Sequence, residues 1–496
     1  MLIETKPIMR AFLKKRELVR QHIDSYNDFI ENRLQEIIND TGKIETDIGV
    51  EVRLGKITVD KAEVIEADGS KNRLKPVEAR LRNLSYFSPI YLEMTPKKVD
   101  QEGETETVKI GMLPTMLKSK ICNLYGLSDA ELVKASEDPL DPGGYFIVNG
   151  SERALVTIED LAPNKIMLEH SEKYTKTTEV AKVFSKRSGF RALVTVERDK
   201  DGLIGVSFPS VPGEIPFIIL TRALGLETDQ EIVNTISDDP EIVQSILENL
   251  EEYLDVKTTQ AAIEIIGKKV AAGQTREYRL KRAEQVIDRY LLPHIGVEPE
   301  DRIRKAHYLG RMVIRVLEMA LGKRGPDDKD HYANKRLRLA GDLMEDLFRV
   351  AFYNLTRDIK YQLERAVVRG KEPSVHTAVR TDVLTERIRH ALATGNWVGG
   401  RAGVSQLLDR TNYISVVSHL RRVISPLSRS QPHFEARDLH PTQWGKICPS
   451  ETPEGPNCGL VKNLALACEF STGFDELLIE NVLYDLGVKQ IRKVAL

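Results

Sequence analysis

Residues 440–460 read HPTQWGKICPSETPEGPNCGL, and this stretch says more about the chain than any other. Pro453 and Pro456 stiffen the backbone because proline fixes φ at about −65°. Gly455 between them accepts turn conformations that other residues avoid. The turn carries four polar side chains: Glu451, Thr452, Glu454 and Asn457. Residues 440–460, the signature stretch, therefore predict a rigid loop that presents polar groups to a partner.

The signature stretch lies at the end of a basic segment. Residues 301–446 hold 27 basic and 16 acidic residues, a net charge of +11, although the whole chain has a net charge of -2. A basic segment inside a neutral protein indicates a surface for phosphates. A solvated helix face with unbalanced charge gives the same count, so charge alone leaves both interpretations open.

An acidic segment lies upstream of it. Residues 223–256 contain ten acidic residues and no Lys or Arg. Their apolar residues recur at helical spacing, which predicts amphipathic helices. Negative charge repels DNA, so we expect these helices on an outer domain, away from any nucleic acid.

The remaining patterns mix helices and strands. The pair Asn149-Gly150 predicts a tight hairpin at 144–158. Helices are expected at 14–38, 257–325, 339–369 and 377–394, strands at 48–66 and 74–95, a strand entering a short helix at 113–125, strands around 191–208, and a flexible glycine-rich loop at 395–403. We therefore expect an α+β fold in irregular domains, about three of them for 496 residues.

The chain also lacks several features. No apolar run approaches membrane-spanning length and no signal peptide is seen, so we expect a soluble cytoplasmic protein. Cys122 stands alone, and Cys448, Cys458 and Cys468 form no CxxC pair. We interpret these three as small buried residues and not as zinc ligands.

The most metal-like string is Asp327-Asp328-Lys329-Asp330-His331. Three carboxylates and an imidazole could hold a divalent ion for phosphoryl chemistry. However, basic residues lie on both sides, from Lys323 to Arg338. Carboxylates in such surroundings are more often neutralised by ion pairs, so we predict structural roles.

The signature stretch resembles the motif of the second-largest, beta-like subunit of cellular RNA polymerases. Its sequence is closer to the archaeal and eukaryotic type than to the bacterial type. Further blocks resemble the family in the same order along the chain: LVRQHIDSYNDFI, EARLRNLSYFSPIYLEM, LPTMLKSKICNLYG, DPGGYFIVNGSERAL, DDKDHYANKRLRLAGDL and LATGNWVGGRAGVSQLLDR. The resemblance therefore covers nearly the whole chain, with residues 223–256 the least diagnostic part.

The resemblance implies the domains called protrusion, lobe and fork. We expect the protrusion at 1–156 and again at 325–380, an inserted lobe at 157–324, and the fork region with the start of the external domain at 381–496. Full-length subunits continue well beyond this point. We therefore interpret the chain as the N-terminal half of a subunit that is naturally split, as in some archaea; a truncated chain is the alternative.

The implied function is DNA-directed RNA synthesis within a multisubunit nucleotidyltransferase. In the family, the aspartates that hold the catalytic Mg²⁺ lie on the largest subunit, so we expect no catalytic residue and no metal or other cofactor on this chain. It would form one wall of the DNA cleft, support the RNA–DNA hybrid and help to separate downstream strands. The implied partners are the C-terminal half, the largest subunit, the small subunits, the DNA template and the hybrid.

The resemblance implies nucleic-acid contacts at Arg401, Gln406, Arg421, Arg422, Glu454 and Asn457. We expect one of Arg421 and Arg422 to be structural. Asp409 is expected to orient nearby arginines, and Arg437 and Asp438 to form an internal ion pair. His440 and Trp444 are expected to be packed and hydrogen-bonded.

Two other functions remain open on the residues alone. One is a nucleic-acid-binding scaffold protein that acts by itself. The other is a metal-dependent nuclease centred on Asp327–Asp330. The order of the family blocks argues against both.

Overall fold

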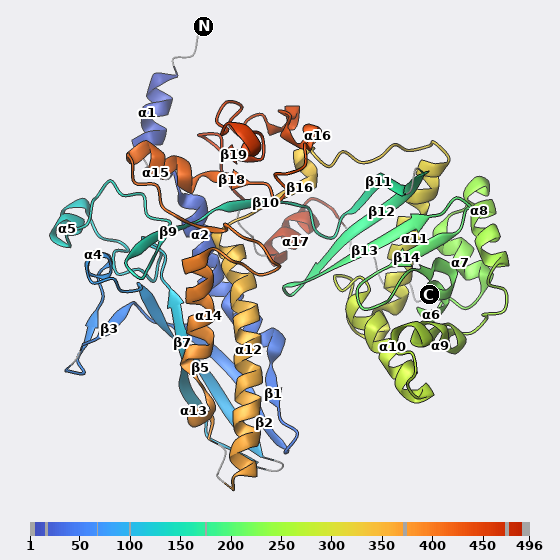
Figure 1. Ribbon diagram of the computed structural model, residues 1–496, viewed down its shortest axis with the longest axis horizontal. Helices are drawn as coiled ribbons and strands as arrows, with labels where there is room; N and C mark the ends of the chain where they lie inside the picture. Colours follow the sequence, from blue (N-terminus) through green and yellow to red (C-terminus); the bar gives the residue numbers. More distant parts are fainter. Residues whose placement is uncertain are drawn as a thin grey trace. The chain divides into compact units, whose positions relative to one another are not determined.

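The computed structural model describes residues 5–14, 18–66, 68–98, 101–173, 176–370, 374–471 and 476–488. The chain divides into two compact units (Figure 1). Unit 1 comprises residues 1–159 and 337–496, and unit 2 comprises residues 160–336. The strands β10 (Thr157–Leu161) and β16 (Lys335–Arg338) contain the two points at which the chain passes between the units.

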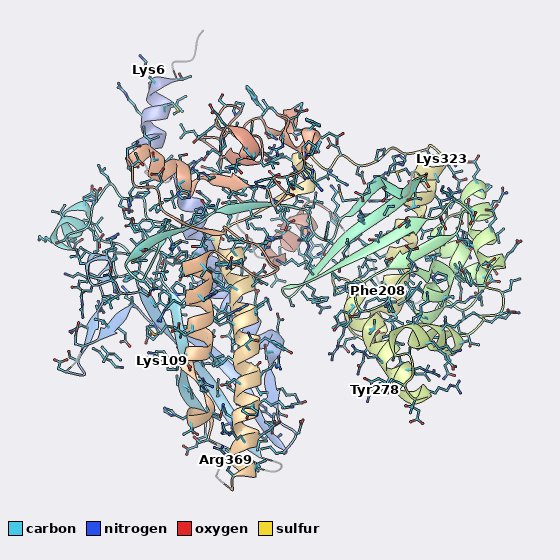
Figure 2. All side chains as sticks on the ribbon, in the orientation of Figure 1. Lys6, Lys109, Phe208, Tyr278, Lys323 and Arg369 are labelled. Carbon is cyan, nitrogen blue, oxygen red and sulfur yellow. The ribbon has the colours of Figure 1, made fainter. Side chains whose placement is uncertain are left out.

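Unit 1 is built around an antiparallel sheet of order β1-β2-β5-β6, in which β7 also pairs with β5. Its strands are β1 (Lys43–Glu45), β2 (Val50–Val59), β5 (Phe87–Lys98), β6 (Gln101–Glu102) and β7 (Glu106–Pro114). The long helix α12 (Ala340–Val368) and the helix α14 (Thr381–Thr394) lie side by side, and α14 packs on β7 (Figure 1). Arg369 marks the end of α12 in Figure 2.

The core of unit 1 follows from the spacing of apolar residues on these helices. On α12 the buried positions Leu343, Leu347, Ala351, Leu355 and Ile359 recur every four residues and form one apolar face. The opposing helical run is α2 (Arg20–Asp28), η1 (Phe29–Arg33) and α3 (Leu34–Thr41).

Gly341 lets α12 approach this run closely. A Cβ atom at Gly341 would lie 2.0 Å from the carbonyl oxygen of Ser25, which no side chain could tolerate. The first turn of α12 can therefore touch the backbone of α2 only because this position is glycine.

Two small sheets of unit 1 carry the sequence motifs. The hairpin of β8 (Phe146–Val148) and β9 (Ser151–Leu155) pairs with β17 (Ser405–Leu407). Strand β10 pairs in parallel with β18 (Arg422–Ile424), which pairs in antiparallel fashion with β19 (Val461–Asn463). Residues separated by 250 or more positions in the sequence are thus brought together.

Smaller elements complete unit 1. They are α1 (Lys6–Lys14), β3 (Glu63–Ile65), β4 (Lys71–Arg73), α4 (Pro76–Leu81), α5 (Asp129–Lys134), α13 (Val375–Ala378), α15 (Tyr413–Leu420), α16 (Phe434–Arg437), η4 (Pro441–Gln443), η5 (Gly455–Asn457) and α17 (Glu476–Asp485).

Unit 2 has its own core between an antiparallel sheet and a layer of helices (Figure 1). The sheet has the order β11 (Ile166–Lys173), β12 (Lys176–Arg187), β13 (Phe190–Arg198), β14 (Ile204–Ser207) and β15 (Ile215–Pro216). The helices are α6 (Phe217–Ala223), α7 (Asp229–Ile236), α8 (Pro240–Glu251), α9 (Thr259–Val270), α10 (Arg276–Tyr290) and α11 (Arg302–Ala320), with η2 (Pro299–Asp301) and η3 (Tyr332–Asn334) as short turns.

The main expectations for the fold are confirmed. The architecture is α+β and irregular, the acidic segment forms α7 and α8, and the hairpin forms with Asn149 and Gly150 at φ of 49° and 75°. The units divide at 159/160 and 336/337, whereas the lobe was expected at 157–324, so the expected domain bounds stay predictions. The domain names themselves stay predictions.

Three expectations are wrong. Residues 76–81 form α4 instead of a strand, because Pro76 starts a helix and Glu78 bonds back to the N–H of Lys75. Residues 115–126 form successive turns after β7 instead of a helix. Cys458 is exposed and Cys448 and Cys468 are half-buried, so only Cys122 is a buried cysteine.

None of the helices within the described ranges is long and apolar enough to cross a membrane.

Candidate nucleic-acid interface

The signature stretch forms a turn that is closed by its own side chains. Gly455 and Gly459 adopt left-handed conformations with φ of 71° and 72°. The hydroxyl of Thr452 donates to the Val461 carbonyl at 2.9 Å and accepts from the Gly459 N–H at 2.9 Å. Thr452 therefore fastens both ends of the turn, and the exposed side chains of Glu454 and Asn457 lie between them.

Two arginines hold the turn from outside. The Arg437 guanidinium donates to the carbonyls of Pro456 at 2.9 Å and Cys458 at 2.7 Å. Arg429 donates to the Asn457 side-chain oxygen at 3.1 Å. The ion pair expected between Arg437 and Asp438 is wrong, because Arg437 uses its donors on backbone carbonyls.

The beginning of the signature stretch agrees only in part with expectation. The Nδ1 atom of His440 accepts from the Thr442 N–H at 3.2 Å, so His440 is hydrogen-bonded as expected. The side chain of Trp444, however, is 80% exposed, and that of Phe434 is 76% exposed. The expected packing of Trp444 is therefore wrong for this chain by itself.

The glycine-rich loop before β17 is anchored by a tryptophan. The Nε1–H of Trp397 donates to the Leu343 carbonyl of α12 at 3.0 Å, and Trp397 is 6% exposed. Gly399, Gly400 and Gly403 take left-handed φ values of 79°, 71° and 74°. This part of the chain thus places the half-buried Arg401 on a glycine loop that starts from a fixed point.

Gln406 lies on β17 and makes two hydrogen bonds through its carboxamide. Its Nε2 donates to the Gly403 carbonyl at 3.0 Å, and its Oε1 lies 3.0 Å from Nε2 of His419 on α15. Asp409, expected to orient arginines, instead accepts from the N–H and the hydroxyl of Thr411 at 2.9 and 2.7 Å. These hydrogen bonds lower the pKa of the Asp409 carboxyl.

The adjacent arginines 421 and 422 have different surroundings. Arg421 is 6% exposed and donates to the carbonyls of Leu18 at 2.5 Å, Ala465 at 2.6 Å and Leu466 at 3.1 Å. These bonds favour Arg421 as the structural member of the pair, and its expected nucleic-acid contact stays untested. Arg422 on β18 is half-buried, and its charge acts on Asp409 and His419.

A cluster of charged residues around Arg410 and Glu152 was not predicted from the sequence. Arg410 bonds Glu152 at 2.5 Å, Asp141 at 2.8 Å and the Tyr145 hydroxyl at 2.7 Å. Arg80 bonds Glu152 from another direction at 2.7 Å. Burial favours the neutral form of Glu152, but the hydrogen bonds and charge of Arg410 outweigh it and lower the pKa of this carboxyl. Arg410 and Glu152 both occur in family-like blocks, which was the available signal.

A second ion pair fixes the strand that follows the signature stretch. Lys462 on β19 contacts both carboxylate oxygens of Glu159 on β10, at 3.2 and 3.0 Å. The two side chains are 7% and 3% exposed. The pair therefore lies in the interior of unit 1, where an unmatched charge would be costly.

The metal-like string lies in unit 2, and its carboxylates have protein partners. Asp327 accepts from the Leu168 N–H at 2.9 Å and Asp330 pairs with Lys335 at 3.0 Å. Asp328 accepts from the N–H of Asp330 at 2.8 Å and of His331 at 3.1 Å. Within the described ranges, no three His, Cys, Asp or Glu side chains are placed to hold a metal ion.

We expect Asp330→Asn to lower the free energy of unfolding by about 1.5–3 kcal/mol, because it removes a charged partner from the nearly buried Lys335. Urea unfolding of the full chain measures this. Asp201→Asn, at an exposed turn position, is the control and should change it by less than about 0.5 kcal/mol. A divalent ion that stabilised the wild type but not Asp330→Asn would contradict the structural role.

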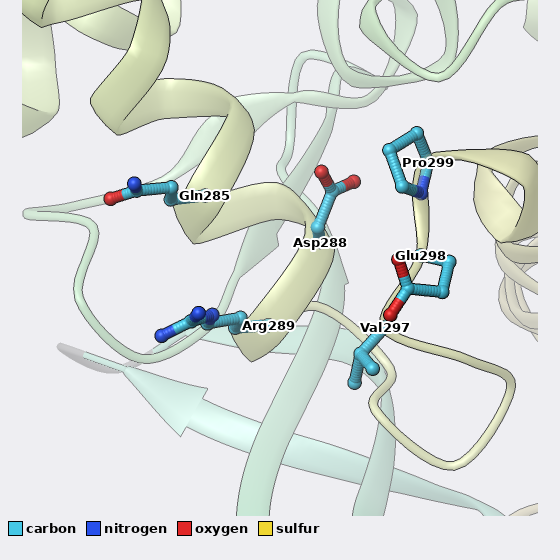
Figure 3. A pocket seen from close by; sticks show the side chains of 6 residues that line it. All are labelled: Gln285, Asp288, Arg289, Val297, Glu298 and Pro299. Carbon is cyan, nitrogen blue, oxygen red and sulfur yellow. The ribbon is translucent and has the colours of Figure 1, made fainter. Parts of the chain in front are cut away.

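Unit 2 also has an open pocket of about 450 Å³. Figure 3 shows its lining side chains: Gln285, Asp288, Arg289, Val297, Glu298 and Pro299. Asp288 is already paired with Arg302 at 2.7 Å. None of the six lining residues is Ser, Thr, Cys, Lys or His, and we assign no site to the pocket.

Comparison with known proteins agrees with the resemblance. Residues 17–386 match the family model described as RNA polymerase beta subunit, and residues 406–470 match the model described as RNA polymerase Rpb2, domain 3. The chain is 57% identical to DNA-directed RNA polymerase subunit Rpo2N of Methanococcus vannielii, over 98% of this chain and 100% of that protein. It is 56% identical to subunit Rpo2N of Methanocaldococcus jannaschii, over 97% of this chain and 99% of that protein.

A third relative is longer. The chain is 54% identical to DNA-directed RNA polymerase subunit Rpo2 of Saccharolobus solfataricus, over 98% of this chain but only 43% of that protein. In some relatives the match thus covers nearly the whole protein, and in others less than half of it.

Proposed function

The chain belongs to the RNA polymerase beta subunit family, and from this premise we propose that it works as the N-terminal half of a split second-largest subunit in a DNA-directed RNA polymerase. The observation that carries the proposal is the match of 98% of this chain to 100% of a relative named DNA-directed RNA polymerase subunit Rpo2N. In this assembly the chain forms one wall of the DNA cleft and supports the RNA–DNA hybrid and downstream strand separation.

Catalysis in this proposal belongs to the assembly. Nucleotidyl transfer needs metal ions that clamp the attacking and leaving oxygens. The carboxylates of the most metal-like string bond to protein donors, which fits structural roles for them. The catalytic Mg²⁺ is placed on another subunit because the family resemblance implies it. This chain then contributes surface and positioning, with no cofactor of its own.

The partners follow from the extent of the relatives. In subunit Rpo2 of Saccharolobus solfataricus the match covers 43% of the protein, so more than half of that protein lies outside the match. We propose that a complementary C-terminal chain, the largest subunit and the small subunits supply the rest of a cytoplasmic enzyme. Exposed apolar side chains on α17, such as Leu477, Ile479 and Val482, fit coverage by such a chain.

The surface proposed to face nucleic acid comprises Arg401, Gln406, Arg422, Glu454 and Asn457. A hybrid is recognised through its shape and backbone, so these contacts need not depend on base sequence. Trp397, Thr452 and Arg437 hold the backbone of this surface through hydrogen bonds to carbonyls, which is consistent with a preformed site.

We expect Arg401→Ala and Arg422→Ala each to shorten the lifetime of elongation complexes at moderate salt. Each removes one phosphate contact, so the slope of log affinity against log salt should become shallower by about 1. The measurement is complex lifetime against salt on two unrelated templates.

Arg73→Ala, which removes an exposed arginine on β4, is the matched control and should behave like the wild type. Wild-type lifetimes for both test variants at every salt concentration would remove these arginines from the site. An effect on one template only would contradict backbone recognition.

A further inference from the structure

A hydrogen bond joins His419 to Gln406, and the other contacts of the two side chains fix which atom donates. His419 is 4% exposed on α15 and lies between β17 and the turn that follows it. Its Nδ1 lies 3.1 Å from the backbone N of Asp409, and its Nε2 lies 3.0 Å from Oε1 of Gln406.

The tautomer of His419 follows from these contacts. A backbone N–H can only donate, so Nδ1 must accept and cannot carry a proton. The proton of the neutral ring therefore sits on Nε2, which donates to Gln406. Burial and the charge of Arg422 lower the pKa of His419 to about 4, in agreement with a neutral ring.

The carboxamide of Gln406 is thereby oriented at both ends. Its oxygen accepts from His419, and its Nε2 donates to the Gly403 carbonyl at 3.0 Å. If the amide were flipped, its NH₂ group would face the Nε2–H donor of His419, and its oxygen would face the carbonyl oxygen of Gly403. One hydrogen of the amide NH₂ remains for another acceptor, and Gln406 is half-buried on a strand with defined register.

We propose that His419 is a positioning residue of the nucleic-acid surface, whose Nε2–H holds the Gln406 carboxamide so that its remaining N–H is offered to an oxygen of the hybrid backbone. The inference rests on the proposed function, since it assumes that Gln406 faces the hybrid. It adds a residue that does not itself touch nucleic acid. Fixing the amide beforehand removes the cost of ordering it upon binding.

Two substitutions separate the two hydrogen bonds of His419. In His419→Asn, the side-chain oxygen takes the place of Nδ1 and keeps the bond from the Asp409 N–H, but the donor to Gln406 is lost. In His419→Gln, the amide nitrogen reaches the place of Nε2 and restores that donor. If His419 were merely structural, the effects of the two variants would not depend on whether the donor to Gln406 is present.

The test uses polymerase assembled with each variant and measures the lifetime of the elongation complex. We expect Gln406→Ala and His419→Asn each to shorten it by about two- to tenfold, the effect of one hydrogen bond. His419→Gln should remain near the wild type. The double variant Gln406→Ala/His419→Asn should be no worse than Gln406→Ala alone, because both changes act through one group.

The outcomes are distinguishable. If Gln406→Ala shortens the lifetime but His419→Asn does not, or if their effects multiply in the double variant, the positioning role is overturned while the site stands. If Gln406→Ala matches the wild type, the proposed contact of Gln406 fails, and the role of His419 fails with it. Equal unfolding midpoints of the variants ensure that lifetime differences do not reflect misfolding.

Discussion

Replacing Arg421 by alanine is expected to lower the free energy of unfolding of unit 1 by about 3–5 kcal/mol, since charged hydrogen bonds are lost and their acceptors stay buried. The lost bonds run to the carbonyls of Leu18, Ala465 and Leu466. These carbonyls belong to segments far apart in the sequence, so one guanidinium joins the start of the chain to the strand region after the signature stretch.

Arg422→Ala is the matched control for this prediction. Arg422 is the next residue and is only half-buried, so its loss should cost less than about 1 kcal/mol of stability. Urea unfolding of the two full-length variants measures the difference. A stable Arg421→Ala chain whose polymerase showed a shallower salt dependence would contradict the structural role and support the original prediction of a nucleic-acid contact.

Replacing Glu159 by alanine is expected to lower the free energy of unfolding of unit 1 by about 3–5 kcal/mol, because it leaves the Lys462 ammonium buried without its partner. Lys462 is 7% exposed, and water cannot readily take the place of the carboxylate. Strand β19, which carries Lys462, follows the signature stretch, so the variant should also disturb the turn of residues 451–459.

A double replacement tests the same pair from the other side. Glu159→Leu combined with Lys462→Met removes both charges and keeps apolar volume, so its stability should return to near the wild-type value or above it. Unfolding midpoints of the two single variants and the double variant give the coupling between the residues. Equal losses that simply add would contradict an interaction of this size.

Local patterns in the sequence predicted much of the fold. Apolar spacing predicted Leu343, Leu347, Val350 and Leu355 on the buried face of α12, and all but the half-buried Val350 are buried. Asn149-Gly150 predicted a hairpin because only such residues accept its turn. These features depend on neighbours within a few residues. Gly341 shows the limit, because its need for a glycine comes from Ser25 on a distant helix.

The candidate site was harder to predict for the same reason. The pattern HLRR contains adjacent arginines, and nothing local tells which one donates to carbonyls that lie 44 or 403 residues away. The role of Arg437 was missed because an aspartate follows it, whereas its partners are carbonyls of the proline turn. The hydrogen bond of His419 to Gln406 spans 13 residues and depends on the placement of α15 against β17.

The most direct test of the account is RNA synthesis by subunits combined in defined sets, given template, nucleotides and Mg²⁺. The complete set contains this chain, a complementary C-terminal chain, the largest subunit and the small subunits. We predict template-directed RNA from the complete set, none when this chain is omitted, and none from this chain alone. RNA made by this chain alone, or undiminished synthesis without it, would contradict the claim that it is a required but non-catalytic part of the polymerase.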